Sequence, residues 1–210
     1  SSFKNKSSTL ILFLSMILAM IPFIVWDVYF TNQGVWGFNA EYLSGIYFFN
    51  LPIEEWLFFI CIPYACVFMQ LALIELSPKW IISQKTADRI TKVLLVLFLV
   101  VLMRNTDKMY TLYDMTYVLI VLITVFVLKK KILRRFYLPF FAMLVPFAIV
   151  NGVLTGYGIE NEVVWYNNAE NLGIRFFTIP IEDFAYAFSM ILSVVYLFDL
   201  FKRKKKLPAD

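Results

Sequence analysis

The sequence contains no histidine among its 210 residues. This absence excludes enzymes whose metal is held by histidine, such as di-iron desaturases, and any mechanism with a histidine general base. A Gly-x-Gly-x-x-Gly motif after a strand is also missing, and with it the usual signature of a dinucleotide or flavin site. Cys61 and Cys66 lie in one apolar run, where small packing residues are expected rather than a disulfide or a metal pair. We therefore expect neither a cofactor nor a metal.

Charge is scarce as well, since 16% of the residues are charged, 61% are hydrophobic and the mean hydropathy is +0.74. A soluble domain of this size cannot bury so much apolar surface. Runs of about 20 apolar residues cross the hydrocarbon core of a bilayer. The sequence predicts an all-α membrane protein, a polytopic helical bundle with six transmembrane helices. They are expected at 9–29, 52–75, 90–104 (a short one), 112–128, 136–155 and 179–201.

Lysine and arginine gather in loops on one side of this bundle. Of the 19, all but Arg104, Lys108 and Arg175 fall there, including Lys4, Lys6 and Lys202–Lys206. The positive-inside rule makes this side cytoplasmic and predicts a multi-pass protein of the cell membrane with both ends of the chain in the cytoplasm. Because the basic runs flank apolar segments, we expect them to contact lipid headgroups and not nucleic acid.

A short acidic motif occurs twice, each time at the start of a long apolar run. Residues 51–55 read Leu-Pro-Ile-Glu-Glu, and residues 179–183 read Ile-Pro-Ile-Glu-Asp. The surrounding sequence repeats too: Pro22 matches Pro146, Asp27 aligns with Asn151, Trp36 with Trp165 across a loop five residues longer in the second copy, and Asn39 with Asn168. Both copies start on the same side, so the sequence predicts two parallel structural repeats.

These repeats divide the chain into a first half-domain at 1–89, a linker helix and loop at 90–111, and a second half-domain at 112–210. The second half-domain has a helix, 112–128, ahead of its repeat unit, and the first has no counterpart. A matching helix before Ser1 would give the full-length protein seven, arranged as three, one and three.

The paired acids have a structural and a functional interpretation. Proline and acidic residues are typical of the first turn of a helix, where they complement its dipole. However, acids at the mouth of a membrane segment are costly unless they are used, and here two adjacent acids with aromatic neighbours occur twice. Adjacent helical positions differ by about 100°, so only one acid of each pair can face inward. The identity of Glu54 and Glu182 favours them over Glu55 and Asp183 for that position.

Carboxyl groups in an apolar, aromatic cavity can carry out proton chemistry. In general, a carboxyl removed from water has a raised pKa and can serve as an acid, while a second, hydrogen-bonded one stays ionised and serves as a base. Aromatic faces stabilise a transient cation. Together these parts can protonate an alkene, hold a carbocation and deprotonate it, without a redox cofactor.

The two motifs, Trp26-Asp27, the loop at 34–39 (Gly-Val-Trp-Gly-Phe-Asn) and the two fused halves resemble the membrane-integral lycopene cyclases, which are distinct from the flavin-binding cyclases. The resemblance implies that lycopene enters from the bilayer and that its ends are cyclised to β-ionone rings. It implies catalytic roles for Glu54, Glu55, Glu182 and Asp183, with Glu54 or Glu182 as the acid and Glu55 or Asp183 as a base. Which motif supplies the acid stays open.

Further residues near the motifs are candidates for substrate binding. The aromatic ones could clamp an end group or stabilise the cation, or could belong to an interfacial aromatic belt. Asp27 could orient the carboxyls or simply end a helix. The set comprises Asp27, Trp36, Phe38, Asn39, Trp56, Trp165 and Asn168.

Other functions remain alternatives. A small transporter with parallel repeats could use intramembrane acids to carry protons, and a carotenoid-binding membrane protein would hold pigment without converting it. A prenyltransferase would need an Asp-x-x-x-Asp pair for a diphosphate, which is missing. The acids cluster at the outer boundary, which favours the enzyme, and Pro63 could kink the second helix.

Overall fold

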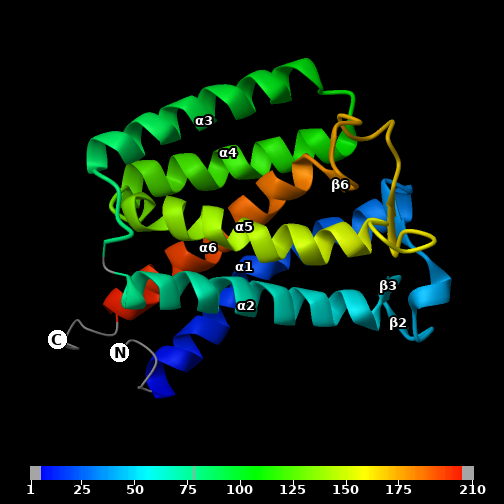
Figure 1. The fold of residues 1–210 in the computed structure, drawn as a ribbon, viewed down its shortest axis with the longest axis horizontal. Coiled ribbons are helices and arrows are strands. Elements are labelled where there is room, and N and C mark those ends of the chain that lie inside the picture. The colour runs from blue at the N-terminus through cyan, green and yellow to red at the C-terminus, as the bar shows by residue number, and fades with distance from the viewer. Residues whose placement is uncertain (1–5, 78, 205–210) are drawn as a thin grey trace.

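The computed structural model describes residues 6–77 and 79–204, and six α-helices account for most of them (Figure 1). The prediction of an all-α helical bundle is confirmed. Five of the helices, all except α3, are long and apolar enough to cross a membrane. The helices are α1 (Lys6–Gln33), α2 (Ile53–Leu76), α3 (Gln84–Arg104), α4 (Met109–Lys129), α5 (Leu133–Leu154) and α6 (Glu182–Lys204).

Helix α3 differs from the others because four charged residues lie among its first nine, at 84–92. It begins at Gln84, earlier than the predicted 90–104, after Ser83 accepts a hydrogen bond from the backbone N–H of Thr86 at 3.0 Å. Such a side-chain cap satisfies one of the N–H groups that a helix start leaves free. The additional turns carry Lys85 and Asp88, which are suited to an aqueous boundary more than to hydrocarbon.

Six short strands form three two-stranded ribbons at the end of the bundle where α1 ends and α2 begins (Figure 1). Two of the ribbons are hairpins that lead directly into α2 and α6, with their turns at Phe49-Asn50 and Phe177-Thr178. Phe49, Asn50 and Phe177 have positive φ values of 50°, 58° and 54°. The pairs are β2 (Tyr47–Phe48) with β3 (Leu51–Pro52), β5 (Arg175–Phe176) with β6 (Ile179–Pro180), and β1 (Trp36–Phe38) with β4 (Val164–Tyr166).

The β1–β4 ribbon joins the two halves and fixes the register of the repeat. Gly37 lies opposite Trp165 at its centre. Two backbone hydrogen bonds of 2.8 Å flank this centre symmetrically, from Asn39 N–H to the Val163 carbonyl and from Asn167 N–H to the Val35 carbonyl. The two halves are therefore related by a pseudo-two-fold axis through the ribbon.

This register corrects the sequence alignment by one residue. Val35 corresponds to Val163, so Asn39 corresponds to Asn167 rather than Asn168, and Trp36 to Val164 rather than Trp165. Val35 N–H donates to the Phe30 carbonyl and Val163 N–H to the Leu154 carbonyl, so these bonds enclose residues 31–34 in one half and 155–162 in the other. The second is thus four residues longer, not five, because aligning the tryptophans shifted the loop.

The helices pack as the two-fold relation requires, α1 against α6 and α5 against α2, with α4 on α6 and α3 on α4. The equivalent helices α1 and α5 both begin at the end of the molecule away from the strands (Figure 1), which confirms two parallel repeats. That this end is cytoplasmic stays a prediction. Lys4, Lys205 and Lys206 lie outside the described residues.

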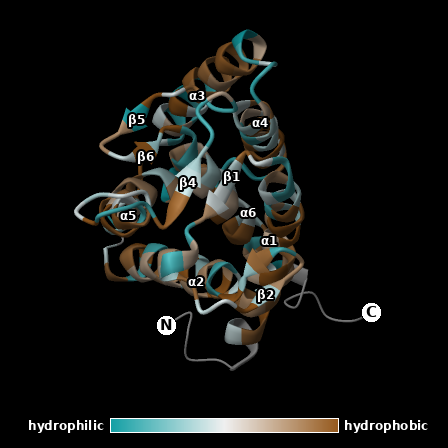
Figure 2. Cartoon of the chain, turned by 90° about the vertical axis from the view of Figure 1, so that its right-hand side faces the viewer, coloured by the Kyte–Doolittle hydropathy of each residue, from teal (hydrophilic) through white to brown (hydrophobic). Residues whose placement is uncertain are grey.

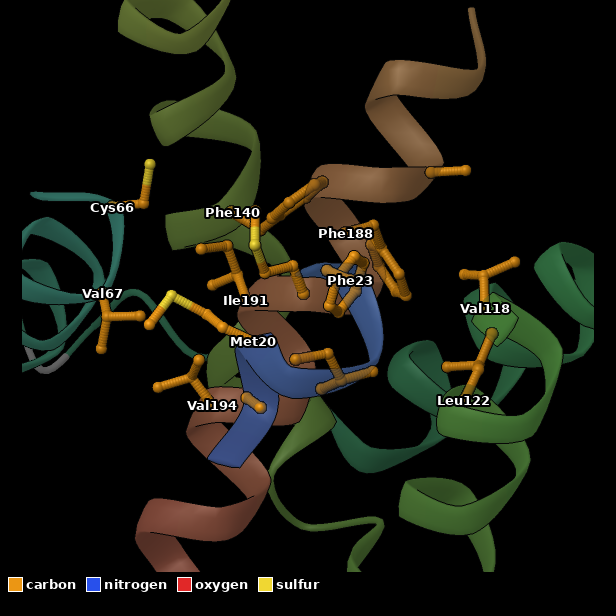
Figure 3. Close-up of a cluster of buried hydrophobic side chains, with 14 of the residues drawn as sticks. Met20, Phe23, Cys66, Val67, Val118, Leu122, Phe140, Phe188, Ile191 and Val194 are labelled. Carbon is orange, nitrogen blue, oxygen red and sulfur yellow. The ribbon is translucent and has the colours of Figure 1, made fainter. Parts of the chain in front are cut away.

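Helix α6 lies at the centre of the apolar core. Within its membrane-length window 61% is buried, against 28–39% for the other four spans. Figure 3 shows Phe188, Ile191 and Val194 of α6 among Met20 of α1, Cys66 of α2 and other side chains from α4 and α5. Because α6 begins with the second acidic motif, this packing fixes that motif firmly.

Candidate functional site

A cavity opens at the strand end of the bundle, between α1, α2, α5 and α6 and beneath the β1–β4 ribbon. Figure 2 looks onto this end and shows β1 and β4 in the middle of the surrounding helices. The cavity has an empty volume of about 710 Å³, including the open space at its mouth, which is in the range of small-molecule sites. Its walls are mostly apolar, and its polar lining consists of Asp27, Glu55, Tyr110, Asn151, Tyr166, Asp183 and Tyr186.

Asp183 is the most extensively hydrogen-bonded carboxyl of the cavity. It accepts hydrogen bonds from the Tyr110 hydroxyl at 2.6 Å, the Asn151 amide at 2.7 Å and the Tyr166 hydroxyl at 3.0 Å. Burial and the nearby Asp183 carboxylate raise the pKa of Tyr166 well above its ordinary value of 10, so its hydroxyl stays protonated and donates. Three donors aimed at one carboxyl favour its ionised form.

Glu55 occupies the equivalent position on α2, but its surroundings differ. Within the described part of the chain, no hydrogen bond fixes its carboxyl, which lies within electrostatic range of both Asp27 and Asp183. Asp27 is buried and accepts a 2.6 Å hydrogen bond from the Trp36 indole, while its Oδ2 has no partner among the described residues. Glu55 is therefore free to reach a ligand, with Asp27 held beside it.

The repeat thus pairs different groups in its two halves. Asn151 stands beside Asp183 in one half, and its counterpart Asp27 stands near Glu55 in the other. An amide donor can satisfy a carboxylate fully. Two carboxyl groups close together in an apolar cavity repel each other when both are ionised. The two inward carboxyls therefore have different surroundings, an amide donor at Asp183 and a second carboxyl near Glu55.

Glu54 and Glu182 have a different position from the one predicted. The Oε1 of each accepts a hydrogen bond from a backbone N–H ten residues earlier, from Ser44 at 2.8 Å and from Leu172 at 2.7 Å. Glu182 also accepts from the Thr111 hydroxyl at 2.8 Å. The prediction that these two face the cavity is wrong, because the preceding loop directs its free N–H groups at the first residue of each acid pair. The second residue, about 100° around the helix, faces the cavity.

The other predicted residues divide into two groups. Asp27, Trp36 and Phe38 line the cavity together with Glu55 and Asp183. Trp56 and Trp165 do not: Trp56 donates to the Phe48 carbonyl at 3.2 Å, and Trp165 lies over Gly37 on the ribbon with its side chain partly exposed.

The two loop asparagines have local structural roles. Asn39 accepts a hydrogen bond from the Glu41 N–H at 3.1 Å and thereby caps a short 3-10 turn. Asn168 accepts a hydrogen bond from the Arg175 guanidinium at 2.9 Å. Neither residue lines the cavity, so the structure does not bring them into the site.

Several residues of the site were not recognised in the sequence. Tyr110 and Tyr166 come from α4 and from β4, and only the folded chain brings them to Asp183. Asp114, one turn after Tyr110, lies behind the cavity lining: it is fully buried near Glu182 and Asp183, and neither of its oxygens has a hydrogen-bond partner among the described residues. An acid inside the apolar run 112–128 was the signal that could have identified it.

Comparison with known proteins shows the family of the chain. The family model described as "Lycopene cyclase" matches residues 2–73 and 107–201, and the unmatched stretch between them contains α3. No curated protein and no solved structure matches the chain significantly. Within the described residues no cluster of acidic, cysteine or histidine side chains could hold a metal ion. The matched segments cover well over half of the sequence, and the chain belongs to the lycopene cyclase family.

Proposed function

We propose that this multi-pass membrane cyclase converts an end group of lycopene to a β-ionone ring by moving one proton onto the substrate and another off it. Its family supplies the class of reaction and the lipophilic carotenoid substrate. The observation that carries the mechanism is the unequal pairing of Asp27 with Glu55 and of Asn151 with Asp183 around one cavity.

In the proposed mechanism the reaction begins at Glu55 and Asp27. Glu55, sharing a proton with Asp27, protonates C2 of the terminal double bond and leaves a cation at C1. The C5–C6 double bond attacks C1, so that the C1–C6 bond forms and the positive charge moves to C5. Asp183 then removes a proton from C6, which gives the C5–C6 double bond of the β ring. One proton enters and one leaves, so the net change is an isomerisation.

The walls of the cavity suit this cation. Trp36, Phe38, Phe58 and Phe147 line it beside the acids. Aromatic faces attract a cation without acting as nucleophiles, and a dry cavity prevents water from trapping the carbocation as an alcohol. Glu54 and Glu182 contribute by holding the loops that close the cavity, and we assign them no proton transfer.

The test is expression in a lycopene-accumulating bacterium, with chromatography of the pigments. Glu55→Gln and Asp183→Asn are expected to abolish ring formation, because each removes a group that exchanges a proton with the substrate. Glu41→Gln, the same change at an exposed acid of the first outer loop, is the control and should cyclise like the wild type. Full ring formation by both cavity variants at normal protein levels contradicts the proposal.

The same experiment separates the two acid positions of each motif. Glu54→Gln leaves the cavity lining unchanged, so ring formation should persist at a reduced level. If Glu54→Gln is inactive while Glu55→Gln is active, the acid is the first residue of the motif and our assignment is reversed.

A further inference from the structure

A second, almost wholly apolar groove lies between α2 and α5, next to the acid cavity. Its empty volume is about 540 Å³, including its open side. Asn151 is its only polar lining residue. Phe58, Ile62, Cys66, Phe147 and Asn151 line the groove and the acid cavity alike. The two spaces therefore adjoin each other, and the groove reaches the Asn151 amide that donates to Asp183.

The other side of the groove opens outward. Ala65 of α2 and Pro146 and Val150 of α5 line it and are exposed, Val150 by 44%. Both helices are long and apolar enough to cross a membrane, so this edge faces the hydrocarbon of the bilayer. The groove thus lies between the lipid phase and the acid cavity, and its apolar walls suit a hydrocarbon.

The equivalent position in the other half of the molecule is closed. Between α1 and α6, the rings of Phe23 and Trp26 pack against Tyr186 with centroids 4.8 and 5.3 Å apart, and Trp26 is only 7% exposed. The two-fold relation makes Phe147 the counterpart of Phe23 and Val150 the counterpart of Trp26. Valine fills much less space than tryptophan, so only the α2–α5 side remains open.

We propose that the α2–α5 groove is the seat of the substrate's polyene chain and its lateral entrance from the bilayer. This inference rests on the cyclase function proposed above and adds the side from which the substrate enters. A linear conjugated polyene is rigid, apolar and far longer than the acid cavity, so it needs a slot that is open at its far end. Because the groove is open and its counterpart between α1 and α6 is filled, one end group occupies the cavity at a time while the rest of the chain lies in the groove and in lipid.

The test is to fill the groove without touching the acids. Ala65→Trp and Val150→Trp are expected to lower ring formation by at least roughly tenfold, because the end group no longer reaches its reacting position. Ile60→Trp is the matched control, since Ile60 is 50% exposed on the opposite face of α2 and should retain wild-type conversion. Protein accumulation in the membrane and the thermal unfolding midpoint are measured for every variant. Where a tryptophan variant does not accumulate, Ala65→Leu and Val150→Phe give the same comparison with less added volume.

The outcomes distinguish this inference from the function on which it rests. Wild-type conversion by Ala65→Trp and Val150→Trp, together with an inactive Asp183→Asn, means that the groove holds only lipid chains and that the polyene enters elsewhere. A wild-type chain that forms no ring overturns the proposed function itself. Equal loss in Ile60→Trp and Ala65→Trp would show that bulk on α2, not the groove, causes the defect.

Discussion

The residues beside the two inward carboxyls determine what each carboxyl can do. Asp183 accepts three hydrogen bonds, whereas Glu55 has the Asp27 carboxyl as its neighbour. The difference arises at one pair of equivalent positions, Asn151 and Asp27. In the mechanism proposed above, identical halves would supply two acids or two bases, whereas the exchange of an amide for a carboxyl would supply one of each.

Asn151→Asp should therefore impair catalysis while conserving size and shape. The change removes a donor from Asp183 and puts a second carboxyl beside it. Losing a hydrogen bond to a charged group costs about 1.5–3 kcal/mol, which corresponds to a rate loss of roughly ten- to a hundredfold. The measurement is the initial rate of ring formation in membranes.

The matched control is Asn39→Asp. Asn39 lies in the outer loop and caps a short turn, which aspartate caps equally well. Its rate should equal that of the wild type. An Asn151→Asp variant that is as fast as Asn39→Asp would show that Asp183 does not depend on its amide partner.

At the scale of elements, each inward carboxyl depends on how a hairpin meets a helix. The β2–β3 and β5–β6 hairpins deliver the chain to α2 and α6, and the first acid of each motif binds the loop N–H ten residues earlier. In the second half, Thr111 of α4 adds a further donor to Glu182. This contact ties a helix outside the two-helix repeat unit to the start of α6.

Thr111→Val should destabilise the protein, because it removes a donor from the fully buried Glu182 carboxyl without changing the shape of the side chain. We expect a loss of about 1–3 kcal/mol in the free energy of unfolding, measured as a lower midpoint in detergent. Thr124→Val, the same change at a partly buried position of α4, should leave the midpoint nearly unchanged. Equal midpoints for the two variants contradict a supporting role for the Thr111–Glu182 bond.

At the scale of the molecule, the site belongs to neither half alone. Glu55 and Asp27 come from the first repeat, Asp183 and Asn151 from the second, and the β1–β4 ribbon joins the halves above them. The ribbon and both acidic motifs lie at one end of the bundle, and the basic loops that contain Lys79 and Lys131 lie at the other. With the basic end in the cytoplasm, the cavity is near the outer surface of the membrane.

This orientation can be tested with single cysteines in a chain whose Cys61 and Cys66 are replaced by serine. Glu160→Cys, in the second outer loop, should react with a membrane-impermeant maleimide in intact cells. Lys131→Cys, at the basic end, should react only after the cells are lysed. The reverse pattern would place both ends of the chain outside and the cavity on the cytoplasmic side.

The sequence alone determined the helices, the membrane and the doubled motif. These follow from local properties: the length of apolar runs such as 9–29, and a short acidic motif that can be recognised in the sequence without knowing which residues it contacts. The sequence also identified Asp27, Trp36 and Phe38 as residues of the site, because each lies within a few residues of a repeated element.

Only the tertiary structure decided which acid of each pair faces the cavity. Because the first acid is glutamate in both motifs, the sequence favoured Glu54 and Glu182 as the inward residues. In the structure both glutamates instead accept a hydrogen bond from the preceding loop. Neighbouring helix positions point about 100° apart. A hydrogen bond from the loop to the first acid of each pair therefore leaves the second acid facing the cavity. The donors to Asp183 come from α4, α5 and β4, which are distant from it in sequence and close only after the helices pack, and no local pattern contains that information.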